Sequence, residues 1–188
     1  MRLILGTVAA ALISSAAGAA TVPIAEPGTE GFKVIAGGGE VIATYKGTTA
    51  AYLNGLYLDN GDGDYTNDMF LFDNYTSVVG STVNLGIFAA GTELLFRLYV
   101  LNTGYNYFTG PGSRNPDSQA HNRVQSDYLT AGTTLVSFED LLDGPFDFND
   151  LSFTFTNTVG LATVPVPASF GLLFAALGGI VAFRRKRA

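Results

Sequence analysis

Cysteine and tryptophan are absent from this chain of 188 residues, and histidine occurs once, at position 121. Without cysteine the protein forms no disulfide, offers no thiolate to a metal and has no cysteine nucleophile. No Gly-x-Ser-x-Gly motif accompanies His121, so the sequence does not indicate a Ser-His-Asp triad. We expect His121, in its polar stretch, to be solvated, and we expect a protein that is not an enzyme. A secreted hydrolase ranks third among the functions considered. Acids are available for a glycosidase pair, but no tryptophan is present to line a sugar cleft.

Basic residues are scarce between positions 21 and 163. This segment holds all 16 acidic residues and only five basic ones, a formal charge of −11. The five are Lys33, Lys46, Arg97, Arg114 and Arg123. A surface this acidic repels phosphate backbones, which argues against nucleic acid as a partner. It suits a protein that is soluble outside the cell or that binds cations.

The N-terminal apolar run is too short for a membrane helix. Arg2 is followed by an apolar stretch at residues 3–13 and then by small residues, with an Ala-x-Ala site at residues 17–19. A cationic start, a short apolar stretch and such a site are typical of a secretory signal peptide. We therefore predict a signal helix at residues 1–20, cleaved after Ala19 or Ala20, and an exported protein.

The C-terminal 25 residues contain three parts in a fixed order. They are the motif Val164, Pro165, Val166, Pro167, Ala168 and Ser169, an apolar run that starts at Phe170 and ends at Phe183, and the basic cluster Arg184, Arg185, Lys186 and Arg187. As a helix, residues 168–183 would be about 24 Å long, short of a hydrocarbon core of about 30 Å, but thinning of the bilayer or snorkelling cations would let them span it. We predict a transmembrane helix with its cations in the cytoplasm and all preceding residues outside it.

The order of these three parts resembles the C-terminal sorting signal of the PEP-CTERM class, in the variant with a Val-Pro-Leu-Pro-Ala motif. Val166 stands where that variant has leucine. The resemblance implies an exosortase, a membrane-embedded cysteine protease or transpeptidase, as the partner that cuts near the motif. The expected location is the inner membrane, with the preceding domain outside the cytoplasm and released to the cell surface or matrix if the tail is cut.

The middle of the chain is long enough for one domain with its own core. Residues 21–39 are rich in glycine, proline and glutamate, and we expect a flexible linker there. From residue 40 onward, short runs of Tyr, Phe, Val, Thr and Leu alternate with Gly, Asn and Asp, which is typical of strands and turns. Strands are predicted at 40–45, 49–58, 68–74, 81–89, 93–102, 106–109, 123–130, 133–138 and 151–156. The expected fold is all-β, an acidic antiparallel β-sandwich of jelly-roll type over residues 40–160.

Two of these runs show the alternation of a half-buried strand. Leu94, Phe96, Leu98 and Val100 form one apolar face, and Leu151, Phe153 and Phe155 form another. We expect the two faces to meet in the core. Between them, residues 110–122 form a polar stretch that we predict to be a loop.

A first acidic constellation contains Asp59, Asp62 and Asp64 among asparagines and glycines. Oxygen side chains at alternate positions are typical of calcium loops, but the EF-hand pattern is not met, because Gly61 stands at its third ligand position. Asn-Gly and Asp-Gly are also strong hairpin signals. The sequence favours a hairpin turn here and leaves calcium open.

A second constellation carries carboxylates and an amide within twelve residues, interleaved with phenylalanine and leucine. Its candidate ligands are Glu139, Asp140, Asp147, Asn149 and Asp150. Clustered carboxylates repel one another unless a cation or backbone donors offset them. The sequence therefore leaves two interpretations open, a calcium site and a capped turn.

The same stretch resembles the C-terminal motif of a bacterial domain of unknown function found in exported and surface proteins. The matching residues are Phe138, Glu139, Asp140, Leu141, Asp147, Phe148, Asn149, Asp150 and Phe153. The resemblance implies calcium at these acids and no particular activity. The leading hypothesis is a non-catalytic envelope or extracellular-matrix protein with polysaccharide as a neighbour.

The alternative is a carbohydrate-binding or adhesion module, in which exposed aromatic side chains contact glycan. The candidates are Tyr52, Tyr57, Tyr99, Tyr105, Tyr107 and Phe108. Such residues are more often strand packing and cross-strand pairs.

Overall fold

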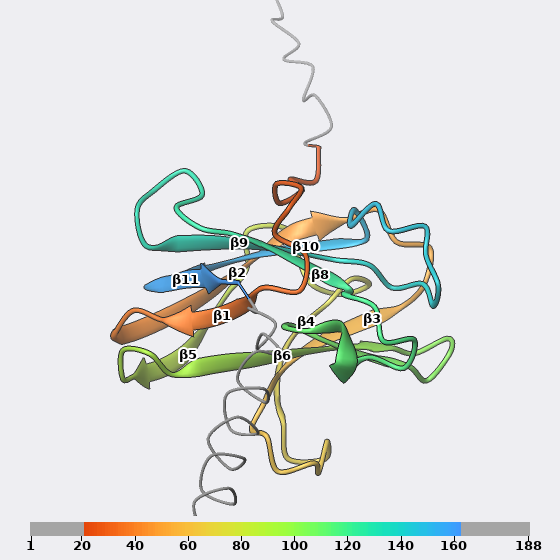
Figure 1. The fold of residues 1–188 in the computed structure, drawn as a ribbon, viewed down its shortest axis with the longest axis horizontal. Helices are drawn as coiled ribbons and strands as arrows, with labels where there is room; N and C mark the ends of the chain where they lie inside the picture. The colour runs from red at the N-terminus through yellow and green to blue at the C-terminus, as the bar shows by residue number, and fades with distance from the viewer. Residues whose placement is uncertain (1–20, 163–188) are drawn as a thin grey trace, which may run out of the picture.

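The protein folds into two antiparallel β-sheets packed face to face, as Figure 1 shows for a computed structural model that describes residues 21–162. Within this range the strands are β1 (Lys33–Ala36), β2 (Gly39–Thr48), β3 (Asn54–Asp59), β4 (Met69–Asp73), β5 (Thr82–Phe88), β6 (Glu93–Val100), β7 (Asn106–Phe108), β8 (Asn122–Gln125), β9 (Thr133–Phe138), β10 (Leu151–Thr156) and β11 (Thr158–Leu161). One short 3₁₀ helix, Gly112–Arg114, precedes β8. The predicted all-β class with antiparallel sheets is confirmed, and the jelly-roll connectivity stays a prediction.

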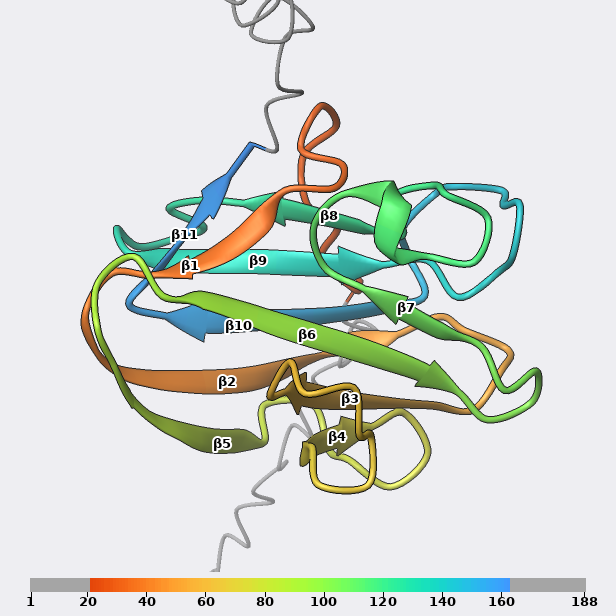
Figure 2. The same cartoon turned by 60° about the horizontal axis from the view of Figure 1, so that its bottom comes forward.

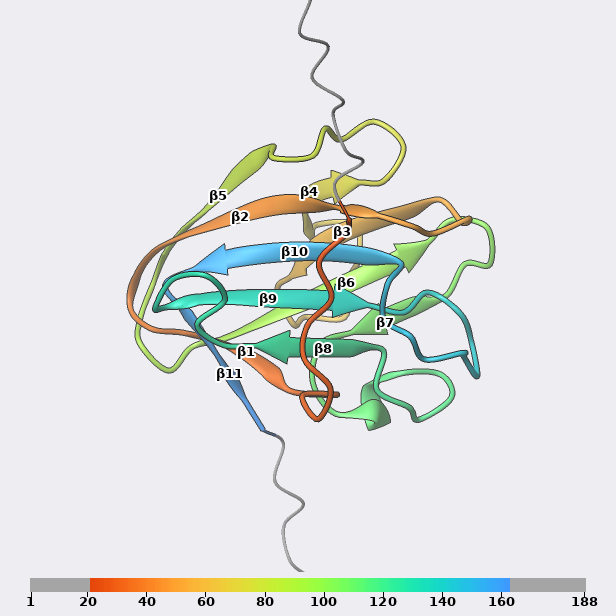
Figure 3. The same ribbon diagram turned by 90° about the horizontal axis from the view of Figure 1, so that it is seen from above.

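The first sheet has the order β11-β1-β6-β3-β4, with β7 paired to β6, and Figure 2 shows these strands in the foreground. The second has the order β5-β2-β10-β9-β8, which Figure 3 shows from above. The start and the end of the domain pair with each other in both sheets. In the first, β1 lies against β11, and in the second β2 lies against β10.

The apolar faces predicted from the alternating patterns meet in the core. Leu94, Phe96, Leu98 and Val100 of β6 are at most 2% exposed. The ring of Phe96 stacks on that of Phe155 in β10, with the centroids 4.0 Å apart. A second aromatic group joins Phe153 to Tyr45 and Phe72 at centroid distances of 5.6 and 5.9 Å. These contacts join the two sheets, because burial of apolar side chains is the main favourable term in folding.

The prediction of a flexible linker at residues 21–39 is wrong. Residues 33–36 form β1, and Gly39 already begins β2. The preceding residues run across the outside of β9 and β10 (Figure 3), where Ala25 is 1% exposed and donates its N–H to Ser137 Oγ at 2.8 Å. The hydroxyl of Ser152 donates to the carbonyl of Pro23. Ser137 of β9 and Ser152 of β10, both fully buried, are thus covered by this arm and hydrogen-bonded to it.

All nine predicted strands are present, β9 and β10 with the predicted bounds and the other seven with shifted ends, but β1 and β11 were missed. Each has only four residues, and β11 follows β10 after a single residue, Asn157. Their mutual pairing, with Lys33 opposite Leu161, gives both a partner that no local pattern indicates.

The predicted signal peptide, sorting motif, transmembrane segment and basic cluster lie outside the described residues. Within residues 21–162, no helix has the length and apolar character needed to cross a membrane.

Candidate metal-binding site

The second acidic constellation lies in the connection between β9 and β10. Phe138 ends β9, Leu151 begins β10, and the two are opposite each other in the ladder. The chain between them therefore leaves and re-enters the sheet at one point, which brings residues 139–140 close to residue 150. The N–H of Asp140 donates to Asp150 Oδ2 at 2.8 Å.

Three carboxylates of this connection converge. Ligand atoms of Glu139, Asp140 and Asp150 lie within 4.8 Å of one another, and no other such group occurs among residues 21–162. Glu139 is 1% exposed and Asp140 2% exposed, and Asp150 is half-buried. The arrangement could hold a metal ion.

Backbone donors hold the side chain of Glu139. Its Oε1 accepts the N–H of Leu141 at 3.2 Å, and its Oε2 accepts those of Asp147 and Phe148 at 3.2 and 3.4 Å. The hydrogen bonds from Leu141 and Phe148 lower the pKa of Glu139, but they do not outweigh the causes that raise it. Burial, together with the negative charge of Asp150, raises the pKa of Glu139 to about 8.

Asp140 is held by a residue from the other sheet. Asn54, the first residue of β3, is fully buried and donates from Nδ2 to Asp140 Oδ2 at 2.7 Å. Burial, together with the negative charge of Asp150, raises the pKa of Asp140 to about 6 in spite of this hydrogen bond. Both aspartates of the group thus have one oxygen, Oδ2, in a hydrogen bond, while Oδ1 accepts none from the described residues.

Two buried polar atoms beside these acids have no hydrogen-bond partner among the described residues. They are Asn54 Oδ1 and the hydroxyl of Tyr107. Burial raises the pKa of Tyr107, and nearby negative charges, including those of Asp117, Asp140 and Glu139, raise it further. Buried polar atoms without partners are rare in folded proteins, and these two could bond a group held at the site.

His121 is buried, so the prediction of a solvated histidine is wrong. Its ring stacks on that of Tyr107 with the centroids 3.8 Å apart and the planes at 13°. Nε2 lies 2.9 Å from Asp117 Oδ2, and Nδ1 lies 3.0 Å from the carbonyl oxygen of Glu139. The polar composition of residues 110–122 suggested an exposed segment. The burial of His121 could not be read from it, because polar groups of this segment form hydrogen bonds inside the fold. His121 ties this segment to the acidic connection.

Asp147 and Asn149 do not join the converging group. The side chain of Asp147 is exposed and accepts from Asn149 Nδ2 at 2.7 Å, while Asn149 Oδ1 accepts from Thr49 Oγ1 at 2.7 Å. They cap the turn, as the second interpretation of the sequence had it. The connection is thus a capped turn that also encloses three buried carboxylates.

Asp59 ends β3, and Asp62 and Asp64 lie in the loop between β3 and β4. The hairpin predicted there is confirmed, with Leu58 opposite Met69. Each carboxylate bonds the chain nearby. Asp59 accepts from Gly61 N–H, Asp62 from Asp64 N–H and Asp64 from Thr66 N–H at 2.6, 2.7 and 3.0 Å. Hydrogen bonds, first of all from Asn67 and Thr66, lower the pKa values of Asp62 and Asp64. This geometry satisfies the carboxylates without a metal.

Asn54 is the site residue that sequence reasoning missed. Its distance along the chain from Asp140, 86 residues, leaves no local signal. No family model, curated protein or solved structure matches the chain in the comparisons made with each. The function is therefore argued from the site itself.

Proposed function

We propose that the domain is a non-catalytic, exported module that binds one calcium ion at Glu139, Asp140 and Asp150. The observation that supports this most is the convergence of three carboxylates in a mostly buried place. None of the ion pairs among residues 21–162 brings a lysine or arginine to them. Like charges this close repel strongly, and a divalent cation is the group that would offset them.

The donor set favours a hard cation. The three acids and the unpartnered Oδ1 of Asn54 are all oxygen donors, which suit calcium and magnesium rather than zinc. Both nitrogens of His121 are already engaged by oxygen atoms. Calcium is favoured over magnesium because magnesium keeps several waters, whereas calcium accepts many protein oxygens in an irregular arrangement.

The proposed role of the ion is structural. Asp140 and Asp150 flank the connection between β9 and β10, and Asn54 belongs to the other sheet. An ion bound here would join the two sheets at this end of the sandwich. It would also hold the segment before β8 in place, because His121 contacts the backbone of Glu139.

The setting we propose is the bacterial envelope or extracellular matrix. It is supported by the signal-peptide pattern of residues 1–20 and by the motif, apolar run and basic cluster of residues 164–188. In this proposal the tail forms a transmembrane helix in the inner membrane, an exosortase-type protease cuts near Val164–Ser169, and polysaccharide is a neighbour.

Thermal unfolding of residues 21–163 in EDTA, in calcium and in magnesium tests the metal proposal. A ligand that binds only the folded state stabilises it by about 2.7 kcal/mol at a hundredfold excess over Kd, which corresponds to a rise in melting temperature of about 10 °C. We expect this rise in calcium, a smaller one in magnesium and none in the variant Asp150→Asn. Equal melting temperatures in EDTA and in millimolar calcium would reject the site.

A further inference from the structure

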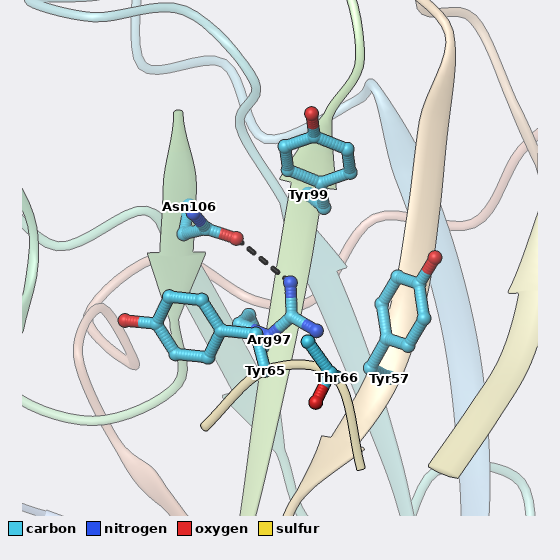
Figure 4. A pocket seen from close by; sticks show the side chains of 6 residues that line it. All are labelled: Tyr57, Tyr65, Thr66, Arg97, Tyr99 and Asn106. Carbon is cyan, nitrogen blue, oxygen red and sulfur yellow. Dashed lines mark hydrogen bonds between the residues drawn. The ribbon is translucent and has the colours of Figure 1, made fainter. Parts of the chain in front are cut away.

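A pocket of about 270 Å³ lies on the outer face of the first sheet, and Figure 4 shows the side chains that line it. They are Tyr57, Tyr65, Thr66, Arg97, Tyr99 and Asn106. Three strands and the loop between β3 and β4 contribute them. None of these residues belongs to the metal-binding site, although Tyr57 shares strand β3 with Asn54.

The register of the sheet sets the positions of these side chains. Tyr57 is opposite Arg97, and Tyr99 is opposite both Gly55 and Asn106. Because side chains two apart on a strand share a face, Arg97 and Tyr99 both point away from the core. At Gly55 an added Cβ would lie 3.0 Å from the ring of Tyr57, so the absence of a side chain there gives that ring its place.

Arg97 lies at the centre of the pocket, but its positive charge is largely neutralised by a neighbouring carboxylate. It is 3% exposed and pairs with Asp68, its Nη2 lying 2.7 Å from Oδ2. Its guanidinium lies 4.4 Å from the ring centre of Tyr57 and 4.6 Å from that of Tyr65, which stand on either side of it in Figure 4. The buried ion pair locks the loop that carries Tyr65 onto β6.

Arg97 also orients the amide of Asn106. Its Nη1 donates to Asn106 Oδ1 at 2.8 Å, as drawn in Figure 4. The amide oxygen is thereby engaged, and Nδ2 donates no hydrogen bond to the described residues. Two N–H donors are thus placed beside three tyrosine rings with hydroxyl groups.

A second hollow continues the pocket. It has a volume of about 410 Å³, shares Tyr65 and Asn106 with the first, and adds Tyr105, Phe108 and Asn115 to the wall. Tyr65 is 46% exposed and Tyr105 37% exposed. Because the two hollows share Tyr65 and Asn106, they form one groove.

We propose that this groove binds a neutral saccharide. A sugar ring has an apolar face of C–H groups that packs on aromatic rings, and hydroxyl groups at its edge that bond amides and phenols. A wall of aromatic rings with a few fixed polar groups is the usual form of a small-molecule site. Two arginines line the groove, and each is paired with an acid: Arg97 with Asp68, and Arg114 with Glu93 at 2.6 Å. An anionic polymer is therefore disfavoured, and the segment 21–163 carries a formal charge of −11.

Binding of the 188-residue chain to soluble glucan, mannan and galactan, measured by affinity electrophoresis and calorimetry in EDTA, tests this proposal. We expect at least one of these neutral polymers to bind and Tyr65→Ala and Tyr99→Ala each to weaken that binding about tenfold or more. Tyr75→Ala is the matched control, because Tyr75 is 54% exposed and does not line the groove. The presence of EDTA separates this result from the metal proposal.

Melting temperatures of the variants exclude loss of folding as the cause of weaker binding. A polyuronate and a proline-rich peptide serve as competing ligand classes. The proposal is overturned if none of the neutral polymers binds, if the two groove variants bind as the parent does, or if only the polyuronate or the peptide binds.

Discussion

Asn54 of β3 donates a hydrogen bond of 2.7 Å to the carboxylate of Asp140, which follows it by 86 residues. The bond crosses from one sheet to the connection that joins two strands of the other. It involves a fully buried amide and a carboxylate that is 2% exposed. This contact makes the acidic site a property of the packed sandwich rather than of one loop.

Replacement of Asn54 by alanine is expected to destabilise the domain by about 2 kcal/mol, because a hydrogen bond to a buried charged group is lost. Calcium affinity should fall as well, since one oxygen donor is removed. Urea denaturation in EDTA and calcium titration measure the two effects. Asn84→Ala is the control. Asn84 bonds Glu40 on the exposed surface, so a change within about 0.5 kcal/mol is expected there.

Stability without metal should fall as the pH rises from about 5 to 8. Glu139 and Asp140 have pKa values raised from 4.5 and 3.8 to about 8 and about 6, so the folded state retains protons that the unfolded state has lost. Their contribution is therefore full below about pH 4 and is lost as the pH passes 6 and then 8. One such proton changes the free energy of unfolding by at most about 1.4 kcal/mol per pH unit.

Urea denaturation in EDTA at a series of pH values measures this slope. The variant Glu139→Gln should have a flatter profile above pH 6, because its amide does not titrate. Calcium should stabilise the parent more at pH 8 than at pH 6, since protons and metal compete for the same oxygens. A profile that rises between pH 6 and 8 in the parent and in Glu139→Gln alike would contradict the assignment.

Asp150→Asn is expected to lose stabilisation by calcium while remaining at least as stable as the parent in EDTA. Asparagine keeps an oxygen for the N–H of Asp140 and removes one of three mutually repelling charges. Asp62→Asn should keep the full calcium response, because Asp62 belongs to the exposed hairpin loop. Paired melting curves with and without calcium compare the two variants. Loss of the response in Asp62→Asn alone would move the site to the first constellation.

Phe155→Ala is expected to cost about 3–5 kcal/mol, because it removes a fully buried ring that stacks on Phe96 across the sandwich. Urea denaturation measures the loss. Val159→Ala in β11 is a suitable control, since Val159 is 42% exposed and should change the free energy of unfolding by less than about 1 kcal/mol. Similar losses in both variants would contradict the assignment of the core.

The three converging acids of the site could be predicted as candidates from their closeness in the sequence alone. Glu139, Asp140 and Asp150 lie close in sequence, and apolar neighbours such as Phe148 and Leu151 hold them near the core. Asp147 and Asn149 share this neighbourhood but differ in outcome, because their side chains point outward and bond one another. Proximity in the sequence thus identified five candidate metal ligands. Only the direction of each side chain, which the sequence does not show, separates the three that converge from the two that do not.

The sequence by itself determined the all-β class, nine of the eleven strands described, the two faces that meet at Phe96 and Phe155, and the acidic connection after β9. These follow from alternation and turn residues, which act over a few positions. Only the tertiary structure decided the pairing of β1 with β11, the burial of His121, the contact of Asn54 with Asp140 and the tyrosine-lined groove around Arg97. Each joins residues far apart in the chain, where the gain in free energy arises only once the two sheets have packed.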